Sequence, residues 1–136
     1  QYPVHMSFTN GVHMKNYAIF EKELKELCKN EKQQILEAKR HIEIIPDRFW
    51  TGIHIKKTKR LDLLQKKLEN LLNKHSKIKR KLYFVPHITL AFPGKFGSLK
   101  KSKNPVTRMK MDRITVVRKD KSGAPYRIHK HILLGK

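Results

Sequence analysis

The sequence predicts an α+β domain with a mostly antiparallel sheet and two helices. At 136 residues the chain has the length of one domain, so residues 1–136 are expected to share one hydrophobic core. Two segments space their apolar residues as amphipathic helices do, and several short segments alternate apolar and polar residues as strands do. Short turns separate neighbouring strand segments, which favours antiparallel pairing.

The chain is expected to open with a strand and a helix. Tyr2–Phe8 alternates and is rich in strand formers, so it is predicted to be a strand that ends at the turn signal Asn10-Gly11. Tyr17–Lys29 has apolar residues on one side of a helix and charged residues on the other. Gln33–Lys39 is expected either to extend this helix or to form a short second one.

The middle of the chain predicts a hairpin and the clearest helix. His41–Ile45 and Phe49–Lys56 read as two strands joined around Pro46-Asp47. From about Lys59 to Lys74, leucines recur every three or four residues, which predicts a helix with one buried side.

The last part predicts a strand, a basic loop and a closing hairpin. His87–Phe92 has strand character, and Pro93–Thr107 carries the glycines and prolines of a loop. Met111–Arg118 and Tyr126–Leu133 are predicted to pair around a Lys-Ser-Gly-Ala turn.

The charge predicts a polyanionic partner. The chain has 32 Lys and Arg against 11 Asp and Glu, a formal net charge of +21, and no acidic residue lies between Asn70 and Met111. RNA is the expected partner, alone or within a larger ribonucleoprotein assembly, because phosphate contacts dominate nucleic-acid binding. A lysine-rich solvated surface is the alternative interpretation. The candidate RNA-binding residues are Lys95, Lys100, Lys101, Lys103, Arg108 and Lys110.

Other classes of protein are disfavoured. No apolar run reaches the length of a membrane span, so no membrane partner is expected.

Cys28 is the single cysteine, which excludes an internal disulfide and a zinc site built from cysteines. A single cysteine also fits an intracellular location, in the cytoplasm or an organelle. His129 and His131 could bind a metal from one strand face, but two ligands without a carboxylate or thiol make a poor site. Neither a metal nor a cofactor is therefore expected.

Two segments carry the same pattern of apolar residue, histidine, apolar residue and hydroxyl residue. They supply His5 with Ser7 and His87 with Thr89. In a strand, residues two apart point to the same side, so each segment offers an imidazole beside a hydroxyl. Such a pair suits phosphodiester chemistry without a metal. One imidazole accepts a proton from the nucleophile, the other donates one to the leaving oxygen, and the hydroxyls bind the phosphate oxygens.

These segments resemble the signatures of the 2H phosphoesterase superfamily, which includes RNA 2′,3′-cyclic phosphodiesterases and 2′–5′ RNA ligase-like proteins. The first signature is Val-His-Met-Ser-Phe and the second is Val-Pro-His-Ile-Thr-Leu-Ala-Phe, and the two histidines are 82 positions apart. The closing hairpin, with its Gly-x-x-Tyr turn, is also similar. The resemblance implies a two-lobed, mostly antiparallel sheet with two main helices packed outside. It also implies catalytic roles for His5, Ser7, His87 and Thr89.

One feature departs from that superfamily. Its members carry a strand and a helix before the first signature, whereas four residues precede His5 here. We expect either that this sequence is part of a longer chain that contains the first strand–helix unit, or that the fold has lost it, which would leave one lobe incomplete.

Two functions follow as hypotheses. The first is a hydrolase, a metal-independent RNA phosphodiesterase that acts on 2′,3′-cyclic phosphates or 2′–5′ linkages. The alternative is a non-catalytic, strongly basic RNA-binding component of a ribonucleoprotein that retains the fold.

Overall fold

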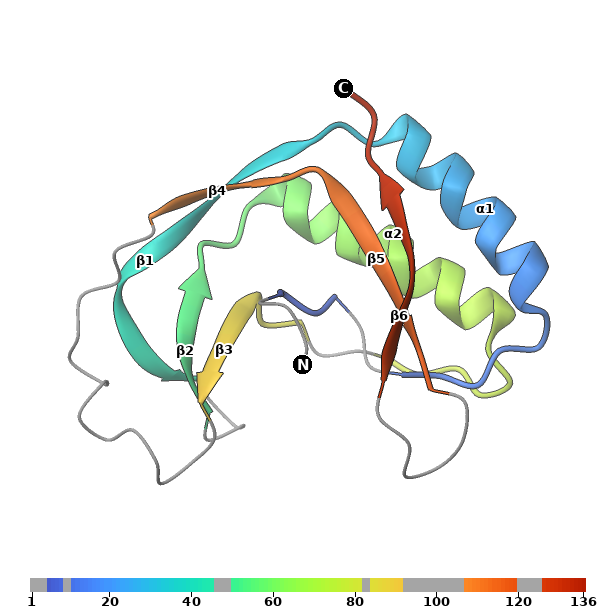
Figure 1. The fold of residues 1–136 in the computed structure, drawn as a ribbon, viewed down its shortest axis with the longest axis horizontal. Coiled ribbons are helices and arrows are strands. Elements are labelled where there is room, and N and C mark those ends of the chain that lie inside the picture. The colour runs from blue at the N-terminus through green and yellow to red at the C-terminus, as the bar shows by residue number, and fades with distance from the viewer. Residues whose placement is uncertain (1–4, 9–10, 46–49, 82–83, 92–106, 120–125) are drawn as a thin grey trace.

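The computed structural model describes residues 5–8, 11–45, 50–81, 84–91, 107–119 and 126–136, and within them the chain forms an α+β fold (Figure 1). Two helices and antiparallel strands account for its regular structure, as predicted. The elements are α1 (Tyr17–Asn30), β1 (Gln34–Ile45), β2 (Trp50–Ile55), α2 (Lys59–His75), β3 (His87–Ala91), β4 (Arg108–Met111), β5 (Arg113–Arg118) and β6 (Arg127–Leu133).

The strands form two sheets that one stretch of chain connects. Four strands pair in the order β3-β2-β1-β4, and β5 pairs with β6 in a second sheet. Only Asp112 separates β4 from β5, so the two strands run almost continuously from one sheet to the other (Figure 1). The Asp112 carbonyl accepts a hydrogen bond from the Leu134 amide at 2.9 Å, which ties the chain's last strand to this crossing point.

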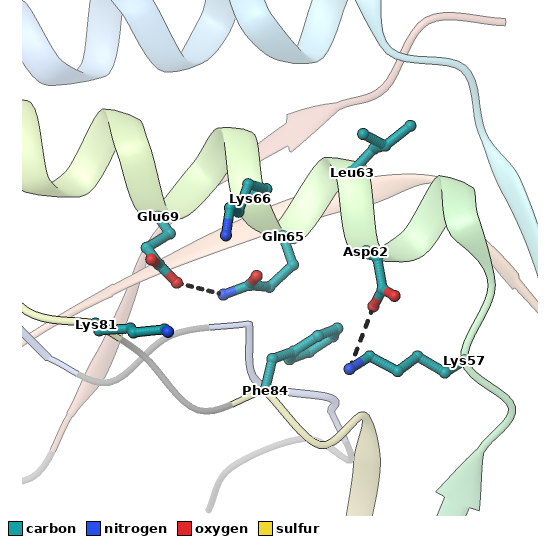
Figure 2. Close-up of a pocket in the computed structure, with 8 residues that line it drawn as sticks. All are labelled: Lys57, Asp62, Leu63, Gln65, Lys66, Glu69, Lys81 and Phe84. Atoms are coloured by element: carbon teal, nitrogen blue, oxygen red, sulfur yellow. Dashed lines mark hydrogen bonds and ion pairs between the residues drawn. The ribbon is translucent and has the colours of Figure 1, made fainter.

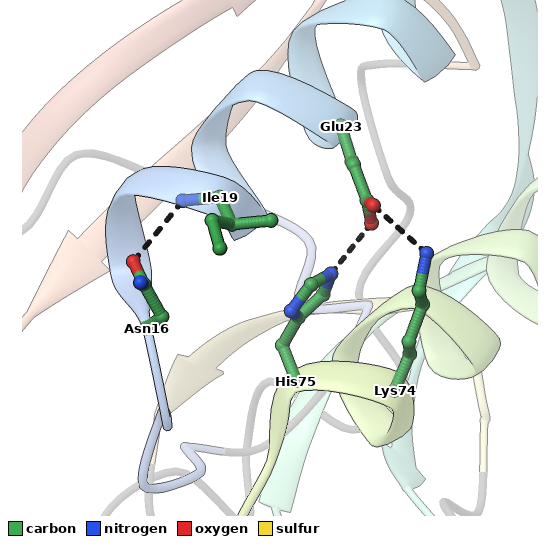
Figure 3. Close-up of polar contacts among 5 residues, drawn as sticks. All are labelled: Asn16, Ile19, Glu23, Lys74 and His75. Atoms are coloured by element: carbon green, nitrogen blue, oxygen red, sulfur yellow. Dashed lines mark hydrogen bonds and ion pairs between the residues drawn. The ribbon is translucent and has the colours of Figure 1, made fainter.

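Both predicted helices are present and begin at capping side chains. The Asn16 side chain accepts a hydrogen bond from the Ile19 amide at 3.3 Å at the start of α1 (Figure 3). Thr58 accepts one from the Leu61 amide at 3.1 Å at the start of α2. Neither of these helices is long and apolar enough to cross a membrane, and the described residues contain no other.

One hydrophobic cluster joins the helices to the sheets. Leu24 and Cys28 of α1 and Leu61 and Leu64 of α2 are almost completely buried. Each such leucine stabilises the fold by about 1.5–3 kcal/mol through its removal from water. Burial also raises the pKa of the Cys28 thiol to about 11, so this cysteine is a protonated core residue. The strands contribute Leu36, Ala38, Ile53, Ile55, Ile88, Met111, Ile114 and Ile132.

Polar contacts bind the two helices to each other at two places along their length. Glu23 of α1 lies 2.8 Å from Lys74 Nζ and 2.5 Å from His75 Nε2, both on the last turn of α2 (Figure 3). Hydrogen bonds from His75 and then Lys74 lower the pKa of Glu23 below its usual value. Lys67 forms an ion pair with Glu31 at the other end of α1.

The prediction for Gln33–Lys39 is wrong, because this segment is a strand and not a helix. It forms the first half of β1 and pairs with β4 from Gln34 to Glu37. Leu36 and Ala38 are buried while Ile35 and Glu37 are exposed, which is the period of a strand. Glu, Ala and Lys favour helices intrinsically, but pairing with strands on both sides outweighs that preference.

Both predicted hairpins are confirmed in their paired strands. β1 pairs with β2 from Ile45 and Trp50 onward, and β5 pairs with β6 over their whole length. The turns between these strands lie outside the described residues. So does almost all of the loop predicted at Pro93–Thr107, where Thr107 alone is described.

A polar cluster holds α1 against the two-stranded sheet. Glu21 of α1 lies 3.1 Å from Lys130 Nζ of β6 and accepts a hydrogen bond from the Tyr17 hydroxyl, also at 3.1 Å. The hydrogen bond from Lys130 is the main reason that the pKa of Glu21 falls to about 2. Burial, followed by the bond to Glu21, raises the pKa of Tyr17 to about 12, and Arg118 stacks 4.9 Å above its ring.

Replacing Glu21 should therefore weaken this contact in a pH-dependent way. The pKa of Glu21 is lower in the folded chain than its ordinary value of 4.5, so its contribution is present above about pH 4.5 and lost as the pH falls towards 2. Glu21→Gln should lower the melting temperature by a few degrees at pH 7, and the difference from wild type should shrink between pH 4.5 and 2. Thermal unfolding at several pH values measures this. Glu26→Gln, at an exposed position on the same helix, is the control, and an equal effect of both substitutions would contradict the assignment.

Candidate active site

The first histidine segment lies beside the strand that carries the second. Met6 pairs with Ile88 of β3 in an isolated antiparallel bridge. The Phe8 ring stacks on the Phe84 ring with 5.6 Å between their centroids and 18° between their planes. The strand predicted at Tyr2–Phe8 is thus reduced to one bridge in residues 5–8, and residues 1–4 lie outside the described part of the chain.

Burial shows which face each side chain of these two segments occupies. The central residues of the two segments, Met6 and Ile88, face inward. Ile88 is 7% exposed, and Met6 is partly buried and packs against the core cluster. His5 and Ser7 are exposed, and His87 is half-buried. Because neighbouring strand residues point to opposite faces, the histidines and hydroxyls lie on the face away from the core.

The register brings the two segments together with opposite polarity. Met6 and Ile88 form the one bridge between these segments, and extending its antiparallel register by one residue each way would set His5 opposite Thr89 and Ser7 opposite His87. Each imidazole would then lie next to its own segment's hydroxyl along the chain and opposite the other segment's hydroxyl. That the four side chains form one group stays a prediction.

A backbone contact orients the His87 ring. Its Nδ1 lies 2.6 Å from the carbonyl oxygen of Val85. A carbonyl oxygen only accepts, so Nδ1 carries the hydrogen and Nε2 is the ring atom that gains or loses a proton. Such a contact fixes both the tautomer and the orientation of an imidazole.

Gly52 of β2 supports the second histidine segment from the neighbouring strand. It is the register partner of Thr89, and a Cβ at this position would lie 2.4 Å from the Ile88 carbonyl oxygen. A side chain does not fit there, so the close approach of β2 to β3 requires glycine. Sequence reasoning did not single out Gly52, although an isolated glycine inside a strand pattern is a known signal of close backbone approach.

His54 is a second residue of this region that sequence reasoning set aside. It is the register partner of His87 and is 9% exposed. The sequence pattern does not favour it, since the residue two positions further along is Lys56 and not a hydroxyl residue. Its place beside His87 depends on the pairing of β2 with β3, which the sequence alone does not specify.

Two of the predicted RNA-binding residues share the sheet face of the histidines. Arg108 and Lys110 of β4 are exposed and pair with Glu37 and Ile35 of β1. The positions that alternate with them are Met109 and Met111, which face the core. Strands β1 and β2 carry their buried residues on that same core side, so the two cations lie on the opposite face, with His87. The remaining predicted residues, Lys95, Lys100, Lys101 and Lys103, lie outside the described part of the chain.

Lys39, Arg40 and His41 add positive charge next to this face. Ala38 of β1 pairs with Ile55, and the next pair is Ile42 with Ile53, so three residues of β1 bulge opposite the single residue His54. All three bulged residues are exposed. The bulge therefore presents basic side chains close to the second histidine segment.

His129 and His131 do not share a face, contrary to the expectation for that strand. His131 Nδ1 is hydrogen-bonded to Thr115 Oγ1 at 2.9 Å, whereas His129 Nε2 lies 3.6 Å from Glu21 on α1. A register shift leaves His129 as an extra residue in β6, which changes the alternation. Among the described residues, no group of three or more His, Cys, Asp or Glu side chains is placed to bind a metal ion.

Comparison with known proteins identifies no relative. No protein-family model matches the chain. No curated protein matches it either. The site is therefore described by its geometry alone.

Substituting Gly52 should disturb the second histidine segment. Gly52→Ala places a methyl group against the Ile88 backbone, so β2 and β3 must separate. The substitution should lower the free energy of unfolding by about 1–3 kcal/mol, as overpacking usually does. Denaturant unfolding measures this, and Gly11→Ala is a matched control because its Cβ meets mainly the end of the Tyr126 side chain. If the two variants were equally stable, the tight contact would be disproved.

Proposed function

We propose that the chain is a metal-independent RNA phosphodiesterase that acts on 2′,3′-cyclic phosphates or 2′–5′ linkages. His5 and His87 are its acid–base pair, and Ser7 and Thr89 bind the phosphate. The observation that carries this proposal is the Met6–Ile88 bridge, which brings the two histidine segments side by side. The inward position of both central residues supports it, because the histidines then share the outer face.

The reaction needs one proton acceptor and one proton donor on opposite sides of a phosphorus atom. For a cyclic phosphate, a neutral imidazole accepts a proton from water as the water oxygen bonds to phosphorus. The other imidazole, protonated, donates a proton to the ribose oxygen as its bond to phosphorus breaks. After one turnover the two rings have exchanged protonation states, and exchange with solvent restores them. The exposure of His5 supports such an exchange.

The hydroxyl groups act on the phosphate oxygens that do not leave. Negative charge grows on these oxygens in the transition state, and a hydroxyl donor stabilises it. The Met6–Ile88 bridge supports this role, since an antiparallel register extended from it would set one hydroxyl near each imidazole. A 2H phosphoesterase-like fold, with two lobes and helices outside, is part of the proposal. It is supported by the two sheets and by the single crossing between β4 and β5.

Removal of either imidazole should abolish most of the activity. His5→Ala and His87→Ala should each lower the turnover of a 2′,3′-cyclic nucleotide or a 2′–5′ dinucleotide by about 10²–10⁴-fold, the usual contribution of a positioned acid or base. Steady-state kinetics measures this, with EDTA present in a parallel series. The rate in EDTA should be unchanged, because the proposed chemistry uses no metal.

His13→Ala is the control for these variants, because His13 is exposed and lies outside both segments. Its activity should equal that of the wild type. Loss of activity in EDTA, or equal losses in all three histidine variants, would contradict the two-histidine mechanism.

A second candidate function is RNA binding without catalysis, as a structural component of a ribonucleoprotein. The exposed cations on the outer sheet face favour it, since Arg108 and Lys110 lie on β4 and the basic bulge lies on β1. Phosphate contacts of this kind position an RNA backbone without reading its sequence. This function requires none of the histidines.

The salt dependence of RNA binding should locate this surface. Each phosphate contact contributes about 0.7–0.9 to the slope of log K against log salt. The double variant Arg108→Gln, Lys110→Gln should therefore reduce the slope for a mixed-sequence single-stranded RNA by about 1.4–1.8. Lys22→Gln with Lys29→Gln removes two exposed charges from α1 and should leave the slope unchanged. Equal slopes for both variants would exclude β4 as the binding surface.

A further inference from the structure

A cavity lined by charged, polar and apolar side chains lies beside α2 and adjoins the first histidine segment, because its lining residue Phe84 stacks on Phe8. It has a volume of about 440 Å³, within the range of small-molecule sites. Figure 2 shows it between one side of α2 and the chain that approaches β3. Its lining residues are Lys57, Asp62, Leu63, Gln65, Lys66, Glu69, Lys81 and Phe84.

Two polar side chains of α2 form the inner wall of this cavity. Gln65 and Glu69 are 6% and 8% exposed, and Gln65 Nε2 donates a hydrogen bond to Glu69 Oε2 at 3.1 Å (Figure 2). Within the described residues this is the single hydrogen bond of the Glu69 carboxylate, so Oε1 remains an acceptor. A buried carboxylate with unused acceptor capacity favours a ligand with N–H donors.

The rim of the cavity is positively charged. Lys57 Nζ lies 3.6 Å from Asp62 and is partly neutralised by it. Lys66 and Lys81 are exposed, and neither forms an ion pair with a carboxylate of the described chain. In Figure 2 the Lys81 ammonium group points along the opening between α2 and Phe84. These cations favour a ligand that also carries an anionic group.

Phe84 forms the apolar side of the same cavity and is 8% exposed, so that only a small part of its ring is available to a ligand. Its ring is stacked against Phe8 and lies below Gln65 in Figure 2. Aromatic side chains bind nucleobases by stacking, whatever the base. A nucleotide combines the three features that this cavity favours, namely an edge with N–H donors, a planar ring and a negative charge.

We propose that this cavity binds a guanine nucleotide, either free or as one residue of an RNA strand. The Watson–Crick edge of guanine carries two adjacent N–H donors, N1–H and N2–H, which match the acceptors of Glu69. The guanine O6 atom accepts from the second hydrogen of the Gln65 amide. Lys66 and Lys81 bind the phosphate as exposed cations do.

The other bases do not complement this wall. Adenine and cytosine each present one amino donor beside a ring nitrogen whose lone pair would face the carboxylate. Uracil has one N–H between two carbonyl oxygens. Each of them leaves a buried polar group without a partner, which weakens binding.

This inference goes beyond the proposed phosphodiesterase and uses different residues. Gln65 and Glu69 belong to α2, which packs on the core side, whereas the histidine side chains lie on the other face; the cavity adjoins the first histidine segment through the stacking of Phe84 on Phe8. A guanine site here would explain how an RNA could be held by one base while its phosphate reacts elsewhere. It can be tested by binding alone, whether or not the protein is catalytic.

Titration of the full chain with nucleoside monophosphates tests the proposal. Calorimetry or NMR chemical shifts should show that guanosine 5′-monophosphate binds about tenfold or more tightly than the adenosine, cytidine and uridine monophosphates. Glu69→Gln should remove this preference, because an amide cannot accept both N–H groups. Glu26→Gln should retain it, since Glu26 is exposed on α1. Equal binding of all four nucleotides, or an unchanged preference in Glu69→Gln, would overturn the proposal.

Two further measurements keep the result independent of folding and of catalysis. Lys66→Gln with Lys81→Gln changes exposed residues only, and should bring the affinity for guanosine monophosphate down to that for guanosine. His87→Ala should bind guanosine monophosphate as the wild type does, even where it has lost turnover. If His87→Ala abolished this binding, the nucleotide would occupy the histidine face and the cavity proposal would be wrong.

Discussion

Burial of one face of the four-stranded sheet constrains the rest of the molecule. Leu36, Ala38, Ile53, Ile55 and Ile88 belong to the same hydrophobic cluster as the leucines of α2. Since side chains alternate along a strand, burial of these residues requires their neighbours to lie on the other face. That face therefore receives His87, Thr89 and the cations of β4. The burial that stabilises the fold thus also determines the face on which the candidate catalytic residues lie. A one-residue slip of β3 would bury His87 and expose Ile88.

Irregular pairing then adjusts the regular pattern at three places. In β1, three bulged residues lie opposite His54. In β2, the register with β3 shifts between Thr51 and Gly52. In β6, His129 is an extra residue without a register partner in β5. Bulges redirect side chains locally without changing the order of the strands. In β1 the result is a group of exposed cations, and in β6 it is the separation of two histidines. The contact of Gly52 with the Ile88 backbone lies next to one of these shifts.

Local patterns predicted the parts of this fold that depend on period and capping. The leucine spacing of α2 and the apolar side of α1 were sufficient, because burial of one helix side gives a clear signal. Gln33–Lys39 was mistaken for helix, since its composition favours a helix while its pairing with β2 and β4 makes it a strand. The histidine and hydroxyl pairs were visible as repeated motifs. Gly52, His54 and the Gln65–Glu69 wall were not, because their roles arise from contacts between segments distant in sequence.

Catalysis and RNA binding place compatible demands on the outer face. The two-histidine reaction needs side chains that exchange protons, and a neutral hydroxyl is enough to bind each phosphate oxygen. Binding a long RNA needs many fixed positive charges, which lysine and arginine supply at any physiological pH. Here the histidines and the basic residues lie on the same sheet face but at opposite edges of the sheet. The two histidine segments are at the β3 edge, and Arg108 and Lys110 are at the β4 edge. An RNA backbone that crosses the sheet from β4 to β3 would meet the cations first and reach the histidines at one phosphate. Under the proposed function, the high charge of the chain would raise the local concentration of RNA, while the choice of the reacting phosphate would depend on the side chains on either side of Met6 and Ile88.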